Sequence, residues 1–227
     1  LLDDAYALGA EGGIVDFMLA SFGTGALLKF SRGDAAAAHS RLAEGLDIAK
    51  TLQLPRLAAR LLNDSVRIAA LSGEPIEESL ARRVAPSNSQ RRDELDAVTA
   101  DLIEDAQIRM LLIDGTPSAL DEACARAGAC RDRIDEHNRP RAHLRATLQL
   151  THCLRAAGDH DEAVRVLYPA LRTCAALGLS QLLIDEGPQM VRLAQDAVHP
   201  SRSRSPDRAT LANVLDFVSN LADTSGV

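Results

Sequence analysis

The sequence predicts an all-α fold in which antiparallel helix pairs stack into a right-handed superhelix. Its residues are 46% apolar but only 3% aromatic, with no Trp, and this excess of small and aliphatic side chains favours close-packed helices over sheets. Between residues 161 and 177 the apolar positions recur every three or four residues, as one buried helical stripe requires. The stripe consists of Ala163, Leu167, Leu171, Cys174 and Leu177.

An internal repeat is the third observation behind this fold class. A constant shift along the sequence superimposes Gly33 on Gly158 and Asp34 on Asp159. The same shift pairs the apolar positions that follow: Ala38 with Ala163, Leu42 with Leu167, Leu46 with Leu171, Leu52 with Leu177, Leu54 with Leu179 and Leu57 with Leu182. Chance does not easily supply a Gly-Asp turn followed by a whole apolar register. We therefore predict equivalent helix-turn-helix units around residues 28–57 and 150–190, each of which needs stacked neighbours to bury its apolar face.

Start and stop signals place the helices in order along the chain. Asp34 is a suitable N-cap for the helix that follows it, and Pro55 suits the first turn of the next helix. Glycines such as Gly73, Gly115 and Gly178 mark helix ends. The expected helices span residues 1–10, 14–31 with interruptions at the glycines 23 and 25, 35–52, 56–71, 76–84, 93–114, 118–137, 140–157, 161–177 and 209–221, with a further helix beginning after residue 178.

The domain organisation predicted from these segments is one repeat domain, residues 1–198, a linker, residues 199–207, and a terminal amphipathic helix within residues 208–227. The polar segment 85–92 has no apolar periodicity, and we interpret it as an internal loop rather than a hinge because the repeat register resumes after it. Residues 199–207 are basic and Ser-rich, which is typical of a solvated tether; phosphorylation of its serines is the alternative. The terminal helix is suited to cap the last repeat with one apolar side: Leu211, Val214, Leu215, Val218 and Leu221.

Composition argues against several classes of function. A net charge of −7 argues against a nucleic-acid-binding surface, because phosphate neutralisation dominates such binding. The sequence contains no signal peptide and no long uncharged apolar run, so we expect a cytoplasmic protein without membrane contact. The four cysteines lack a C-x-x-C spacing, and we interpret them as reduced, buried small residues rather than metal ligands.

Catalysis is not indicated by any spacing of reactive residues. The glycines in residues 22–29 resemble a phosphate loop only superficially, because the G-x-x-x-x-G-K-[ST] spacing is missing; close helix packing explains them better. The histidines show no metal-binding spacing, and no Ser-His-Asp or Cys-His arrangement is suggested. We therefore expect no catalytic residue, no metal site, no cofactor and no enzymatic activity in this chain.

The segments SRGDAAAAHSRLAEGLDIAKTLQLPRLAARLLNDSVRIAAL and LRAAGDHDEAVRVLYPALRTCAALGLSQLLIDEGPQM carry a family resemblance. They resemble the tetratricopeptide-like repeat region of MalT-type transcription regulators, the ATP-dependent members of the LuxR family, in which the repeats close on a [Leu/Phe]-x-Asp-Glu-Gly-Pro segment. The C-terminal region of mycobacterial protein kinase K is similar as well. The resemblance covers residues 1–195 and implies a sensor and scaffold region within a larger protein. Because the chain begins without Met in what looks like mid-helix, we expect it to be a fragment.

Candidate binding residues lie on the predicted helix 56–71. Arg60, Asn63 and Arg67 share one of its faces with Asp64. Such a stripe is more often a solvated face, but on the first helix of a repeat it would line the concave surface and could bind an anionic ligand. Asp185 and Glu186 are the second candidate: we favour helix punctuation at a helix start, while the resemblance implies a junction with a neighbouring domain.

The predicted function is that of a non-catalytic sensor and scaffold region of a MalT-type regulator, which binds an effector or partner protein and gates ATPase and DNA-binding modules. The alternatives are the regulatory repeat region of a serine/threonine protein kinase and a stand-alone protein-docking adaptor. Expected partners are a small effector molecule or an acidic peptide or protein, and the neighbouring domains of the parent chain. Self-association stays open.

Overall fold

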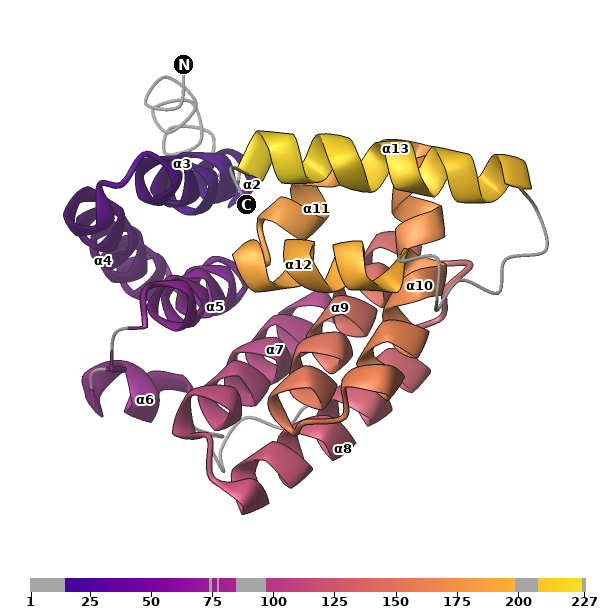
Figure 1. Cartoon of the computed structure of the whole chain (residues 1–227). Helices are drawn as coiled ribbons and strands as arrows, with labels where there is room; N and C mark the ends of the chain where they lie inside the picture. Colours follow the sequence, from indigo (N-terminus) through magenta and orange to yellow (C-terminus); the bar gives the residue numbers. More distant parts are fainter. Residues whose placement is uncertain (1–14, 74, 77, 85–96, 199–207, 226–227) are drawn as a thin grey trace. The chain divides into compact units, whose positions relative to one another are not determined.

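A computed structural model describes residues 15–73, 75–76, 78–84, 97–198 and 208–225, which form helices and turns without a strand among them (Figure 1). The predicted all-α class is confirmed; the right-handed superhelix stays a prediction. The chain divides into two compact units, Leu1–Ile113 and Asp114–Val227. The predicted first helix 1–10, the internal loop 85–92 and the linker 199–207 lie outside the described residues.

Unit 1 is built around the helix pair α4 and α5, which packs against the helix before it. Its elements are α2 (Val15–Met18), the π-helix η1 (Leu19–Thr24), α3 (Gly25–Ser31), α4 (Ala35–Thr51), α5 (Pro55–Ser72), α6 (Glu78–Val84) and α7 (Ala97–Asp114). Its largest fully buried side chains include Phe22, Leu42, Leu57, Leu61 and Ile68. A smaller apolar cluster joins Val66 of α5, Val84 of α6 and Ala106 of α7.

The interruption predicted in helix 14–31 does not occur. Residues Leu19–Thr24 continue the helix as a π-helical segment. Gly23 lies within this segment, and a Cβ atom there would be 2.9 Å from Oδ2 of Asp64. The prediction that this glycine permits close packing is therefore confirmed. Arg41 of α4 also holds the segment, since its Nη2 donates to Oγ of Ser21 at 2.7 Å and its guanidinium lies 4.9 Å from the Phe22 ring centroid.

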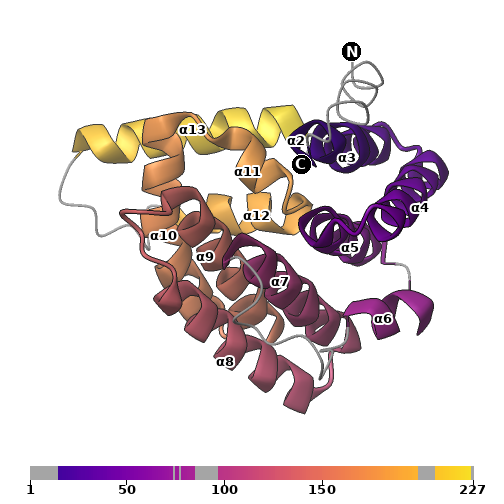
Figure 2. The same ribbon diagram turned by 180° about the vertical axis from the view of Figure 1, so that it is seen from behind.

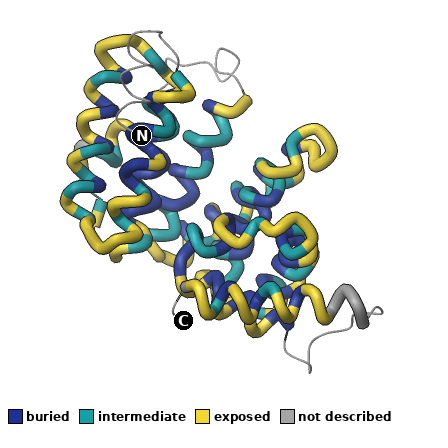
Figure 3. Tube along the Cα trace, turned by 90° about the horizontal axis from the view of Figure 1, so that it is seen from above, coloured by how far each residue is buried: buried dark blue, intermediate teal, exposed yellow. Residues whose placement is uncertain are grey.

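Unit 2 places α9 between α8 and α10, with the last helix packed on α10 and α12 (Figure 2). Its elements are α8 (Pro117–Arg133), α9 (Pro140–Ala156), α10 (His160–Leu177), α11 (Ser180–Ile184), α12 (Pro188–Ala197) and α13 (Arg208–Ser225). The core includes Leu148, Leu167, Leu171, Leu183 and Met190, all fully buried. Along both units the tube in Figure 3 alternates between buried and exposed colours, as expected for helices that bury one face.

The two predicted helix-turn-helix units have the same local geometry, one in each compact unit. Gly33 and Gly158 both adopt positive φ, +83° and +87°. The next residue is the N-cap in both: Asp34 accepts the N–H of Ala37 at 3.0 Å, and Asp159 accepts that of Glu162 at 3.3 Å. The aligned pairs at 38/163, 42/167, 46/171 and 57/182 are buried in both copies. The two hairpins therefore share the turn, the N-cap and these buried positions, while their stacking as repeat units stays a prediction.

Two predicted helix boundaries are wrong, and so is the predicted burial of one aligned pair. Leu52 and Leu177 are 52% and 63% exposed, because each lies at the last turn of its helix, beyond the packed stripe. The helix predicted over 118–137 ends at Arg133, where Asp135 begins a turn by accepting the N–H of His137 at 2.8 Å. The terminal helix begins at Arg208 and extends to Ser225.

The terminal helix packs as predicted through Val214, Val218 and Leu221, which join the unit 2 core. Leu215 is 37% exposed and belongs to the other side, and the Leu211 side chain lies outside the described part of the chain. No described helix combines the length and the apolar character needed to cross a membrane. Three of the cysteines, Cys130, Cys153 and Cys174, are buried as predicted, and Cys124 is half-buried.

Candidate functional site

The polar side chains predicted to form a stripe on α5 make hydrogen bonds to other residues of unit 1. Nε of Arg60 donates to Oδ2 of Asp64 at 2.8 Å, one turn along the same helix. Nδ2 of Asn63 donates to Oδ2 of Asp105 at 2.5 Å and to the Leu102 carbonyl at 3.1 Å, both on α7. These bonds join α5 to α7 through polar groups.

The exposure expected for this stripe is wrong. Asn63 and Arg67 are only 6% and 5% exposed, so they form neither a solvated face nor an open concave surface. The physical reason is that α5 is covered on two sides: Leu57 and Leu61 face the core made with α3 and α4, while Asn63 faces α7. Arg60 remains partly exposed. Ligand binding by Arg60, Asn63 and Arg67 stays a prediction, without the exposed surface that suggested it.

Asp185 and Glu186 lie between α11 and α12, directly before Gly187, the N-cap residue of α12. Asp185 follows the last residue of α11 and accepts a hydrogen bond from Nε2 of Gln181 at 2.6 Å. Glu186 is buried in unit 2, with Oε2 3.4 Å from Nε2 of His152 on α9. Gly187 then turns the chain into α12 with φ +89°. A role as an interdomain junction stays a prediction.

A cavity of about 350 Å³ opens in unit 2 where α9 meets the end of α8 and the middle of α10. The ends of two helices position it: α8 stops at Arg133, the Asp135 turn follows, and Pro140 begins α9, which contributes His143, Leu144 and Thr147 to the lining. The lining residues are Arg131, Glu136, His143, Leu144, Thr147, Arg165, Val166, Pro169, Ala170 and Thr173.

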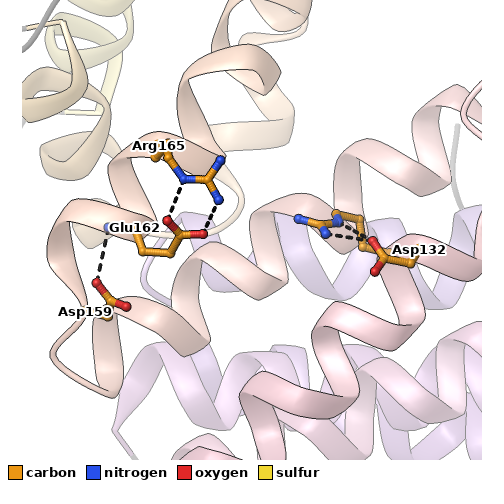
Figure 4. Close-up of polar contacts among 5 residues, drawn as sticks. Asp132, Asp159, Glu162 and Arg165 are labelled. Atoms are coloured by element: carbon orange, nitrogen blue, oxygen red, sulfur yellow. Dashed lines mark hydrogen bonds and ion pairs between the residues drawn. The ribbon is translucent and has the colours of Figure 1, made fainter.

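The two guanidiniums of the cavity are each held by an adjacent carboxylate. Arg131 donates from Nε and Nη2 to Oδ1 of Asp132, at 2.9 and 2.7 Å. Arg165 forms a two-point pair with Glu162, and Figure 4 shows both this pair and the one at Asp132. The Arg165 hydrogen bond is the largest cause that lowers the pKa of Glu162. Arg131, which lies on α8, contributes a smaller attraction to the same carboxylate.

Some of the other polar groups of the lining form hydrogen bonds to described residues, and others do not. The Thr147 hydroxyl donates to the His143 carbonyl at 2.9 Å, and that of Thr173 to the Pro169 carbonyl at 3.3 Å. Within the described part of the chain, Glu136 makes no hydrogen bond or ion pair. The cavity lining therefore combines four apolar residues with six polar or charged ones.

Sequence reasoning missed this cavity because its lining comes from three helices and a turn, none of which carries a motif. One signal was available in the sequence. Pro169 stands inside a predicted helix, where proline removes a backbone N–H and often marks a functional distortion. The structure does not bring the candidate residues Arg60, Asn63 and Arg67 into the cavity, since they belong to unit 1. Among the described residues there is no cluster of three potential metal ligands.

Comparison with known proteins gives one kind of relative. The chain is 42% identical over 188 residues to the serine/threonine-protein kinase PknK of Mycobacterium tuberculosis and of Mycobacterium bovis. The match covers 82% of this chain and 16% of the length of those relatives. No family model matches the chain, and no solved structure matches it. The predicted similarity to mycobacterial protein kinase K is confirmed.

Proposed function

We propose that this chain is a non-catalytic regulatory region of a larger cytoplasmic serine/threonine protein kinase, and that it binds a small effector in the unit 2 cavity. The observation that carries the proposal is the 42% identity to PknK over 188 residues, a segment that is 16% of that kinase. A segment of this size within a kinase is suited to modulate the activity of another part.

The residues of the chain support a binding role rather than a catalytic one. Its sequence contains neither the Gly-rich loop nor the D-F-G motif with which protein kinases hold ATP and magnesium. The hydroxyls of Thr147 and Thr173 are bonded to backbone carbonyls, so neither is paired with a base as a nucleophile requires. The cavity offers a preformed volume at the lower end of the range typical of small-molecule sites.

A second candidate is the sensor region of a MalT-type regulator. It is favoured by the repeated Gly-Asp hairpin, at Gly33 and Gly158, and by the segment Asp185–Pro188 that follows the second hairpin. The two candidates differ in what adjoins this region. Kinase motifs upstream would favour the kinase, and a phosphate loop with a helix-turn-helix module would favour the transcription regulator.

A chimaeric kinase tests the regulatory role. This chain replaces the matching segment of PknK, and its autophosphorylation is measured. It is compared with two variants: Thr173→Trp, which places a large side chain in the cavity lining, and Thr224→Trp, at an exposed position of α13. If the cavity controls the kinase, Thr173→Trp changes the rate by at least about fivefold, the size of a modest allosteric coupling. Thr224→Trp should match the unsubstituted chimaera.

Two outcomes contradict the proposal. Equal rates for the Thr173→Trp variant, the unsubstituted chimaera and a chimaera lacking the segment would remove any regulatory role. Phosphorylation of a generic substrate by this chain alone, with ATP and magnesium, would contradict its non-catalytic character.

A further inference from the structure

The charge of the unit 2 cavity is set by Glu136. The lining contains two guanidiniums, and each is bonded to a carboxylate: Arg131 to Asp132 and Arg165 to Glu162. Glu136 lines the same cavity and has no such partner within the described residues. The lining and its bonded partners therefore hold one carboxylate more than they hold guanidiniums. The Nη1 groups of Arg131 and Arg165 are left as hydrogen-bond donors. The positive charge of each guanidinium is already balanced by its bonded carboxylate.

The hydrogen-bonding groups of the lining also favour a ligand that donates hydrogen bonds. The Thr147 and Thr173 hydroxyls have already donated their hydrogens to carbonyls of their own helices, so what they still offer a ligand is acceptor lone pairs. Pro169 has no N–H, and the Arg165 carbonyl is therefore without its regular helical donor. Both residues line the cavity. Acceptor oxygens thus come from α9, from α10 and from Glu136.

The rest of the lining is apolar. Leu144, Val166 and Ala170 are buried and form the floor with the ring of Pro169. Such a floor favours a ligand with a hydrocarbon body, because covering apolar surface is favourable in proportion to its area. A ligand that matches both features has donors at one end and carbon along its length.

We propose that the cavity binds a small organic cation, an amine with an apolar body whose ammonium group lies beside Glu136. The ammonium has three donors and no acceptor, which matches the acceptor-rich wall, and its charge complements the unpaired carboxylate. The inference rests on the proposed effector site and adds the chemical class of the effector. It concerns a different site from the anionic ligand expected from the sequence, because that expectation relied on arginines of α5 in unit 1.

Hexylammonium, with hexanoate and hexanol as probes of equal length, tests the inference. Binding to the whole chain is followed by backbone amide shifts in NMR and by calorimetry. Hexylammonium should bind with Kd on the order of 1–10 mM, as expected for so small a ligand, and should shift the amides of Val166 and Ala170. Hexanoate and hexanol should bind at least about fivefold more weakly.

Matched variants locate the binding. Glu136→Gln should weaken hexylammonium about fivefold, since the carboxylate is exposed and its attraction is screened. Glu122→Gln makes the same chemical change on α8 outside the cavity and should leave Kd unchanged. Thr173→Trp should abolish the amide shifts at Val166 and Ala170.

Three results would overturn the inference: no hexylammonium binding to the wild-type chain, equal Kd for wild type and Glu136→Gln, or tighter binding of hexanoate. They are distinguishable from failure of the proposed function. If hexanoate binds and Thr173→Trp blocks it, the cavity remains an effector site for a ligand of opposite charge. A chimaeric kinase insensitive both to Thr173→Trp and to loss of the segment would remove the regulatory role whichever probe binds.

Discussion

At the scale of the residue, burial rather than spacing decides what a polar side chain does. Asp64 is fully buried, with Oδ2 paired to Arg60 at 2.8 Å and close to the space that a Gly23 side chain would need. The Asn63 side chain donates a hydrogen bond to the Leu102 carbonyl on α7. A helical wheel places these side chains on a polar face. Whether that face is exposed to solvent depends on the neighbouring helix. Their partners indicate structural roles.

Cys174 shows the same effect on a reactive group. Burial raises the pKa of its thiol from 9.0 to about 11, so roughly one thiol in a thousand is ionised at about pH 8. Iodoacetamide should therefore label half-buried Cys124 before Cys174 in the folded protein, as measured by peptide mass spectrometry. Because the folded pKa is raised, this thiol's contribution to stability is present below pH 9.0 and is lost as pH rises through about 11. Alkylation of Cys174 as fast in the folded as in the denatured chain would contradict the assignment.

At the scale of the element, the two hairpins end in the same way with different residues. Gln53 and Gly178 occupy aligned positions, and both have left-handed backbone, with φ +53° and +65°. After each of them the chain closes the helix with the same bond: Leu54 N–H to the Ala49 carbonyl, and Leu179 N–H to the Cys174 carbonyl, both at 2.9 Å. This pattern is the Schellman motif, in which glycine is preferred because it has no Cβ. Gln53 therefore carries a strain that Gly178 avoids.

Gln53→Gly should stabilise unit 1 by about 0.5–1 kcal/mol, since relief of left-handed strain outweighs the greater freedom of glycine in the unfolded chain. Urea denaturation measures the change. Gly178→Gln in unit 2 makes the reverse substitution and should destabilise by a similar amount. Destabilisation by Gln53→Gly would mean that its side chain makes a compensating contact.

At the scale of the whole molecule, the two units have separate apolar cores. Leu42 belongs to the core formed by α3, α4 and α5, whereas Leu167 belongs to the core formed by α9, α10, α12 and α13. They are aligned positions of the repeat, yet they lie in different packing clusters. Substitutions at the two sites should therefore act independently.

Leu42→Ala and Leu167→Ala should each cost about 2–5 kcal/mol, because both side chains are fully buried. The double variant should equal the sum of the single changes within about 0.5 kcal/mol, as for residues without shared contacts. Leu52→Ala and Leu177→Ala, at the exposed aligned pair, are matched controls and should cost under about 0.5 kcal/mol. Single changes near zero in a denaturation series would remove the repeat alignment.

The sequence by itself determined the local features of this protein. Apolar spacing, the Gly-Asp turns and proline positions predicted the helices, their caps and the equivalence of the two hairpins, because these depend on residues within a few positions of one another. Only the tertiary structure decided which polar faces are buried and where a cavity opens. Asn63 needed α7 to become buried, and Glu136 needed α9 and α10 to become part of a site. Such contacts join distant segments, and a pattern read along the chain does not specify them.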